Sequence, residues 1–198
     1  RQIGATIVRL SVPMHSKAGL ITSGTLQASF ASMFFLDGCS IEAMDSVSPA
    51  YLEAQRKWRE NPDLLTPNVK AYMLQSEWMR KRHGYRYVSE SKKRIPILRS
   101  AYDDALKEVD ALVMPTTPMK ATRLPDGDAS PETITSLAFE PTTNTSPFNS
   151  THHPALSIPC GTVEGLPVGM MLIGRHYDEA TLYQIGDLFE RRFDWKEQ

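Results

Sequence analysis

Two apolar runs near the C-terminus constrain the fold more than any other feature of the sequence. ALSIPCG (155–161) and LPVGMMLIG (166–174) are separated only by the four residues TVEG. Two runs of this length joined by a short link that ends in glycine predict a β-hairpin, with Gly165 in the turn, where φ is positive. The C-terminal part of the chain therefore contains an antiparallel pair of strands.

Helical patterns occur on both sides of this hairpin. Apolar residues from Leu98 to Val109 fall at i, i+3, i+4, i+7, i+8 and i+11, which predicts a helix with one apolar stripe that closes at Asp110. Pro96 lies either near the start of this helix or inside a longer helix that begins around Tyr85. Other helices are predicted over 19–36, from Tyr51 to the stop at Asn61-Pro62, from Thr66 as N-cap with Pro67 in the first position, over 132–139, and from Asp178 onward.

Two further segments are typical of strands. Ala5–Val12 is rich in Ile, Val and Leu and ends at Pro13, and ALVMP (111–115) leads into a turn-prone TTP; both are expected to be buried strands. Strands that alternate with helices predict an α/β fold, a layered α/β/α arrangement with a mixed β-sheet. A length of 198 residues is better suited to one domain over 1–198 than to two.

The composition excludes several functional classes. The net charge of −1 gives no long-range attraction for nucleic acid or anionic lipid, so neither is expected as a partner. The basic run WMRKRHGYRY (78–87) could contact nucleic acid, but a solvated helix face that breaks at Gly84 explains it equally well. The most apolar segment, FASMFFLDGC, is interrupted by Asp37 and Gly38 and does not predict a membrane span. Cys39 and Cys160 are interpreted as reduced thiols of a cytoplasmic protein.

The stretch FNSTHHPALSIPCG (148–161) contains the densest set of polar groups. Neighbouring residues in an extended segment point to opposite faces, so His152 and His153 are not expected to bind one ion together. The remaining histidines are scattered along the sequence, and no HExxH, CxxC, GxSxG or GxGxxG motif occurs, which predicts no metal site and no nucleotide cofactor. The residues alone give no complete catalytic set.

The order of the C-terminal motifs resembles the C-terminal third of the amidase signature hydrolases. The resemblance rests on DALVMPTTP, on NTSPFNSTHHPALSIPCG and on EGLPVGMMLIGRHYDEATL, in that order, and GATIVRLSVP-MH and AYDDALKEVD match upstream segments. It extends over nearly the whole chain and includes a weaker similarity to the broad-specificity bacterial amidases associated with nitrile breakdown. The implied fold is the C-terminal portion of the amidase signature fold.

This resemblance implies hydrolysis of carboxamides to carboxylic acid and ammonia without a metal or organic cofactor. Family members use a serine nucleophile, a second serine and an unprotonated lysine, and backbone N–H groups stabilise the oxyanion. These groups belong to a Gly/Ser-rich signature that nothing in this sequence matches, so no catalytic residue is assigned to this chain and the chain alone is expected to be inactive.

The resemblance implies that the segment before the Pro-Phe-Asn motif lines the substrate pocket. Thr142, Asn144 and Thr145 are the expected substrate-binding residues, together with Thr22 in the early helix. An alternative is that Asn144 only hydrogen-bonds the backbone of its own loop, as Asn often does in turns. His152 stands where the family usually has glycine, and histidine tolerates a positive φ better than most residues.

Three functional hypotheses remain open at this point. The first is the C-terminal part of an amidase, whose partners are a small amide substrate and the N-terminal part of the same enzyme. The second is a stand-alone non-catalytic domain for binding or assembly, for which exposed apolar surface predicts a homo-oligomer. The third is an amidotransferase A-type subunit, which predicts partner proteins and a tRNA-linked substrate.

Overall fold

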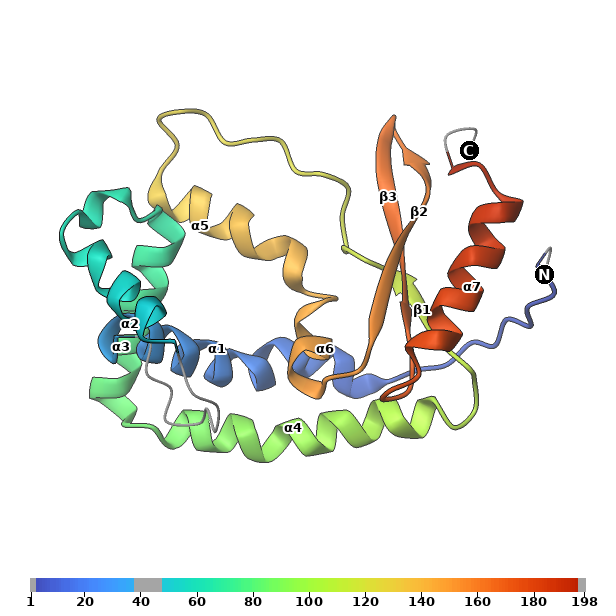
Figure 1. Cartoon of the computed structure of the whole chain (residues 1–198), viewed down its shortest axis with the longest axis horizontal. Helices are drawn as coiled ribbons and strands as arrows, with labels where there is room; N and C mark the ends of the chain where they lie inside the picture. Colours follow the sequence, from blue (N-terminus) through green and yellow to red (C-terminus); the bar gives the residue numbers. More distant parts are fainter. Residues whose placement is uncertain (1–2, 38–47, 196–198) are drawn as a thin grey trace. The chain divides into compact units, whose positions relative to one another are not determined.

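The computed structural model describes residues 3–37 and 48–195, and Figure 1 shows the arrangement of its elements. Along the chain these are η1 (Pro13–Lys17), α1 (Ala18–Phe35), α2 (Pro49–Arg56), η2 (Lys57–Arg59), η3 (Pro62–Leu64), α3 (Pro67–His83), α4 (Arg86–Ala105), β1 (Leu112–Pro115), α5 (Pro131–Phe139), η4 (Glu140–Thr142), α6 (Ser146–Thr151), β2 (Ala155–Val163), β3 (Leu166–Ile173) and α7 (Glu179–Arg192).

The sheet has the strand order β1-β3-β2, so the last strand of the chain lies in the middle. β2 and β3 form the predicted hairpin, with Val163 opposite Leu166 and a register shift between Pro159 and Gly161 that marks a bulge. β1 pairs with the other side of β3, with Leu112 opposite Ile173. The predicted α/β class is confirmed, and both pairings among the described residues are antiparallel.

The hairpin turn has the geometry that the sequence indicated. Glu164 and Gly165 have φ values of 52° and 76°, and a two-residue turn with positive φ at both positions matches the right-handed twist of the strands it connects. The glycine takes this conformation without steric cost, because it has no Cβ. The sequence determines this turn locally.

Helix α7 packs against the hairpin (Figure 1) and encloses a small apolar core with it. Leu172 on β3, Ile158 on β2 and Leu182 on α7 are 1%, 5% and 2% exposed. Because β3 is the central strand, Met171 and Ile173 on its other face are buried as well, at 3% and 0% exposure. The centre of this part of the molecule is therefore the strand that is last in sequence.

Most of the predicted helices form. Thr66 and Pro67 begin α3, Asp178 is the N-cap of α7, and Gly84, with φ 63°, ends α3 inside the basic run. For α4, the longer of the two alternatives holds, since the helix begins at Arg86 and continues through Pro96. The predicted end at Asp110 is too late, because α4 stops at Ala105 and the chain continues in tighter turns, with Lys107 N–H donating to the Asp104 carbonyl.

Two strand predictions need correction. Ala5–Val12 has no regular secondary structure, and Ile7 and Val8 are 68% and 52% exposed. A segment with strand composition becomes a strand only if it has a partner to pair with, and none of the three described strands pairs with it. β1 forms as predicted but is only partly buried, since it lies at the sheet edge and Val113 is 55% exposed.

The chain forms two compact units, each assembled from separated segments. One contains 1–19, 94–124 and 139–198, and therefore the sheet, α6 and α7; the other contains 20–93 and 125–138. Helix α4 contributes residues to both units. The prediction of one domain over 1–198 stays a prediction.

The second unit is built on helix α1 and an aromatic cluster. Phe30 stacks on Phe34 and on Tyr72 of α3, with centroids 5.8 and 5.0 Å apart, and Phe34 contacts the Trp58 ring edge at 5.6 Å. α1 approaches α4 closely at Gly24, where a Cβ would lie 2.7 Å from the Cβ of Ser91. Only glycine allows this packing.

Within 3–37 and 48–195, no helix is both long enough and apolar enough to cross a membrane. Both cysteines were predicted to be reduced. The thiol of Cys160 is free, and Cys39 lies outside the described residues.

Candidate functional site

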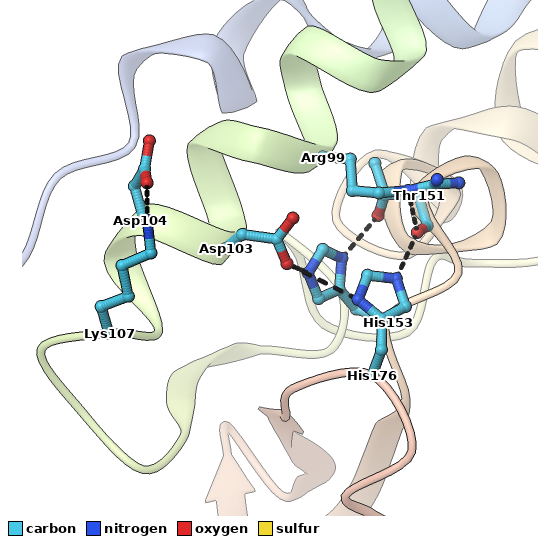
Figure 2. A network of polar contacts seen from close by, with 7 residues as sticks. All are labelled: Arg99, Asp103, Asp104, Lys107, Thr151, His153 and His176. Atoms are coloured by element: carbon cyan, nitrogen blue, oxygen red, sulfur yellow. Dashed lines mark hydrogen bonds and ion pairs between the residues drawn. The ribbon is translucent and has the colours of Figure 1, made fainter.

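A cluster of one carboxylate and two imidazoles lies where three separate segments of the first unit meet. Asp103 comes from the last turn of α4, His153 follows α6, and His176 lies in the turn between β3 and α7. Figure 2 shows both rings beside the Asp103 carboxylate. Asp103 Oδ1 lies 3.2 Å from His153 Nε2 and 3.5 Å from His176 Nδ1, and the two ring centroids are 4.2 Å apart.

The backbone of His152 brings the second of the paired histidines inward. Helix α6 ends here because His152 adopts the left-handed conformation, φ 64° and ψ 22°, while its N–H donates to the Phe148 carbonyl at 2.8 Å. This is the usual way for a helix to end at a residue with positive φ. The expected positive φ is confirmed, and it leaves His152 exposed while His153 is buried.

Thr151 holds both imidazoles in place. Its Oγ1 shares a 3.0 Å hydrogen bond with His153 Nδ1, and its carbonyl accepts a 2.9 Å bond from His176 Nε2. Arg99 Nε donates to the same carbonyl at 3.0 Å (Figure 2). Thr151 is completely buried. It therefore orients the two rings from the protein interior.

The position of His176 depends on a tight turn. Asp178 N–H donates to the Arg175 carbonyl at 3.1 Å, and Tyr177 between them has a φ of 64°. Gly174 N–H donates to the Pro154 carbonyl at 3.0 Å, which joins the end of β3 to the start of β2. His153 and His176 are therefore adjacent because the two strands that they flank are paired.

The electrostatics of the cluster favour neutral His153. Its side chain is buried, and this burial lowers the pKa of His153 below its usual value. The hydrogen bond to Asp103 acts in the opposite direction, while the charges of His176 and Arg99 lower the pKa further. His153 therefore retains a lone pair at neutral pH. Asp104 is not part of this group, since it pairs with Lys107 at 2.6 Å (Figure 2).

Thr151, His153 and Asp103 have the connectivity of a hydroxyl–imidazole–carboxylate triad. A nucleophile must reach the substrate carbonyl, whereas the Thr151 side chain has no exposure to solvent. Covalent catalysis by this threonine is therefore excluded. The ligand atoms of Asp103, His153 and His176 can instead bind a cation or share a proton.

Sequence reasoning missed this cluster. His176, which the sequence reasoning set aside because the remaining histidines are scattered along the chain, lies with its ring centroid 4.2 Å from that of His153. Their separation of 23 residues matches no ligand motif, and Asp103 lies on a helix far upstream. No signal in the sequence identifies the group, because only the pairing of β2 with β3 and the packing of α4 bring it together.

Three of the four predicted substrate-binding residues lie together, in the segment between α5 and α6. Thr142 Oγ1 donates to the Phe139 carbonyl at 2.8 Å, and the Thr142 carbonyl accepts from Thr145 N–H at 3.2 Å. Asn144 Nδ2 donates to the carbonyl of Pro115 at the end of β1, at 2.9 Å. This differs from the alternative of a bond to its own loop, since the amide joins the segment to the sheet.

Thr22, the fourth predicted residue, belongs to the other unit, on α1, and is 8% exposed. That unit contains a cavity of ≈ 550 Å³ between α1 and α4, with Ala31 and Val88 in its walls and Lys92 and Lys93 among its lining residues. None of the four predicted residues lines this cavity. The assignment of Thr22, Thr142, Asn144 and Thr145 to substrate stays a prediction.

Cys160 is a partly buried thiol on β2. Its Sγ donates to the Val168 carbonyl across the hairpin at 3.5 Å, and burial raises the pKa of the thiol. A raised pKa keeps the thiol protonated and unreactive at neutral pH.

Comparison with protein families gives a match to the amidase model over residues 1–183. A protein of Rhodococcus erythropolis named "Uncharacterized protein in nthA 5'region" is 40% identical over 132 residues, which are 67% of this chain and 66% of that protein. The "Enantioselective amidase" of Rhodococcus rhodochrous is 37% identical over 131 residues, 66% of this chain and 25% of that enzyme. The A-type subunit of the glutamyl-tRNA(Gln) amidotransferase from Geobacillus thermodenitrificans is 28% identical over the whole chain, which spans 40% of its length.

Solved structures agree on the fold. A structure described as an amidase is 27% identical, with a TM-score of 0.55 over 73% of this chain and 32% of its own. A 6-aminohexanoate cyclic dimer hydrolase has a TM-score of 0.66 over 98% of this chain and 39% of its own, at 15% identity. This chain therefore spans a minor part of each of these enzymes.

Proposed function

This chain belongs to the amidase family, and we propose on that basis that it forms the C-terminal part of an amidase that hydrolyses carboxamides to carboxylic acid and ammonia. The observation that carries the proposal is the family match over residues 1–183. The order of the hairpin, the Pro-Phe-Asn segment and the acidic start of α7 supports it. The hairpin and α7 form as the sequence predicted, whereas the Pro-Phe-Asn segment forms the short helix α6, which was not among the predicted helices.

Higher identity to amidases favours an amidase over an amidotransferase component. The Rhodococcus amidase is 37% identical in its matched region, against 28% for the Geobacillus amidotransferase protein. Membership of the broad-specificity bacterial amidases associated with nitrile breakdown stays part of this proposal. The amidotransferase remains a second candidate because its match extends over the whole chain. It predicts that partner proteins co-purify and that a tRNA-linked substrate is used.

We propose that the chain supplies fold and pocket wall rather than the reacting groups. Two side chains that could act as nucleophiles are unsuited to that role, which supports the proposal. Thr151 is buried, and burial raises the pKa of the Cys160 thiol. The hydroxyls of Thr116, which follows β1, and of Ser157 on β2 lie 2.6 Å apart above Gly169 of β3 and share a hydrogen bond with each other. The serine–serine–lysine set of the family would then come from sequence outside these 198 residues.

The isolated 198-residue chain is expected to release no ammonia from acetamide or benzamide above a buffer background. A coupled ammonia assay measures this, with a complete family amidase as the positive control. Turnover by the isolated chain would contradict the proposed division of roles. If the reading frame upstream encodes a lysine followed by a Gly/Ser-rich segment, the longer protein is expected to hydrolyse both amides.

The proposed partners are an amide substrate and the upstream part of the same enzyme, without nucleic acid or membrane. Exposed apolar residues support a covering polypeptide: Ile7 and Val8 lie in an irregular segment, and Val113 lies on the edge strand β1. Edge strands and apolar segments of this kind are usually covered. A stand-alone domain would cover them with a second copy, giving a homo-oligomer that sedimentation of the isolated chain detects.

Asn144 tests the proposed pocket wall. Its Nδ2 is bonded to the Pro115 carbonyl, and we propose that its side-chain oxygen accepts a hydrogen bond from the substrate amide. In the complete enzyme, Asn144→Ala is expected to lower kcat/KM for small amides about fivefold, the loss of one hydrogen bond of roughly 1 kcal/mol. The matched control is Asn149→Ala, an exposed position on α6 that is expected to change nothing. Equal kcat/KM values for the two variants would contradict the assignment of Asn144 to the substrate pocket.

A further inference from the structure

We propose that Asp103, His153 and His176 form a binding site for a divalent transition-metal ion of the zinc type. The three side chains each offer one ligand atom, and these atoms lie within 4.8 Å of one another. Two imidazole nitrogens and one carboxylate oxygen are ligands that Zn²⁺ prefers in proteins. The site is independent of the amide chemistry proposed above.

The distances in the cluster are compatible with a coordination site, although the shorter of the two to Asp103 also meets the criteria of a hydrogen bond. Asp103 Oδ1 is 3.2 Å from His153 Nε2 and 3.5 Å from His176 Nδ1. Charge-assisted N–H···O bonds are shorter, about 2.7–2.9 Å. In a tetrahedral zinc site, bonds of about 2.0–2.2 Å place the ligand atoms roughly 3.3–3.5 Å from one another. Two of the three pairs of ligand atoms therefore have the spacing of a tetrahedral site, and the third pair lies within 4.8 Å.

The hydrogen bonds of His176 determine which of its nitrogens is available. A backbone carbonyl can only accept, so the 2.9 Å contact with Thr151 places a proton on Nε2. In the neutral ring, Nδ1 then directs a lone pair at the Asp103 carboxylate, and two electron-rich atoms face each other at 3.5 Å. A cation between them removes this repulsion. A second proton on His176 would do so too, and the experiment below separates the two.

Thr151 provides the outer support that metal-binding histidines usually have. Its hydroxyl bonds Nδ1 of His153 and its carbonyl bonds Nε2 of His176, so in each ring the nitrogen that does not face Asp103 has an oxygen partner. Such partners fix ring orientation and tautomer.

The surroundings limit the charge of the site. Arg99 is bound to the Thr151 carbonyl and opposes a cation, while Arg175 is paired with Asp110 and Asp178. Asp103 is the carboxylate, among the residues that the structure describes, whose oxygen faces both rings (Figure 2). Asp103 and His176 are 43% and 27% exposed. Water can therefore reach the fourth coordination position, as in sites with three protein ligands.

Titration of the tag-free, chelator-treated 198-residue chain with Zn²⁺, followed by calorimetry, tests the site. We expect one saturable ion per chain and an increase of Tm with added Zn²⁺, because the ion binds the folded state. His176→Gln and Asp103→Asn are each expected to weaken binding at least about tenfold. The matched control is His152→Asn, which removes the adjacent exposed histidine and keeps a residue that tolerates its positive φ.

Absence of stoichiometric binding in the wild-type chain, or equal loss in the His152→Asn control, overturns the proposal and leaves a proton-sharing pair. Because a variant can fail to fold, NMR of the wild-type chain provides a second test that needs no variant. Zinc is expected to shift the imidazole ¹⁵N resonances of His153 and His176, and to leave those of His15, His83 and His152 unchanged. Shifts confined to the latter three histidines would contradict the site.

Discussion

Replacing Tyr102 with alanine is expected to lower the free energy of unfolding by about 3–5 kcal/mol, the usual cost of truncating a large buried aromatic residue. Tyr102 is completely buried on α4. Its ring contacts Phe148 at 4.9 Å and His153 at 5.6 Å between centroids, and its hydroxyl bonds His15 Nδ1 at 2.7 Å. Alanine would leave a cavity at the junction of η1, α4 and α6.

Tyr102→Phe is the matched control, because it keeps the ring and removes only the hydroxyl. Its expected cost is about 0.5–1.5 kcal/mol, the net value of one hydrogen bond. Urea-induced unfolding followed by circular dichroism measures both variants. Equal costs would mean that the ring contributes nothing, contrary to its burial.

The same pair of proteins makes a prediction at alkaline pH. Burial raises the pKa of Tyr102 above the value of about 10 that the unfolded chain has. Below pH 10 the Tyr102 hydroxyl is protonated in both the folded and the unfolded state, so the full stability is present. Between the unfolded-state pKa and the higher folded-state pKa, only the unfolded chain releases this proton, and the free energy of unfolding therefore falls as pH rises through the folded-state pKa. Burial also raises the pKa of Tyr72 and Tyr87, so the quantity to measure is the difference between wild type and Tyr102→Phe.

Leu172→Ala is the second change with a large expected effect, a loss of about 2–5 kcal/mol. Leu172 is 1% exposed on the central strand, between Ile158 of β2 and Leu182 of α7. The lost methyl groups remove apolar contact from all three elements. The cavity cannot close easily, because β3 is hydrogen-bonded to strands on both sides.

Leu188→Ala provides a chemically identical control in the same unit. Leu188 lies on α7 and is 53% exposed, so its truncation is expected to change stability by no more than about 0.5 kcal/mol. Leu172→Met preserves volume and is expected to cost less than about 1.5 kcal/mol. If Leu172→Ala and Leu188→Ala have similar midpoints in urea, the β2–β3–α7 core is not the main source of stability.

Elements encoded by short-range patterns were predicted well. The turn at Glu164-Gly165 follows from the glycine and the flanking apolar runs, and α3 begins at the cap and proline that indicated it. These features depend on backbone preferences within a few residues. The failure at Ala5–Val12 has the complementary reason, since strand formation requires hydrogen bonds to a second segment that local sequence does not specify.

The candidate metal site also depends on contacts that the local sequence does not specify. His152 and His153 drew attention because they are adjacent, yet the backbone turn at His152 separates them, one exposed and one buried. Asp103 and His176 carried no motif and became neighbours of His153 only through the contact of α4 with α6 and the pairing of β2 with β3.

The sequence by itself therefore determined the hairpin, most helix boundaries and, through the order of its motifs, membership of the amidase family, because these depend on local preferences and on the order of residues. Only the tertiary structure decided that β3 is the central strand, that Asn144 is bonded to the end of β1, and that one carboxylate and two imidazoles meet around Thr151. The hydrogen bonds of Thr151 to His176, of Asn144 to Pro115 and of His153 to Asp103 connect residues 25, 29 and 50 positions apart. Packing and strand pairing, rather than local propensity, determine such contacts.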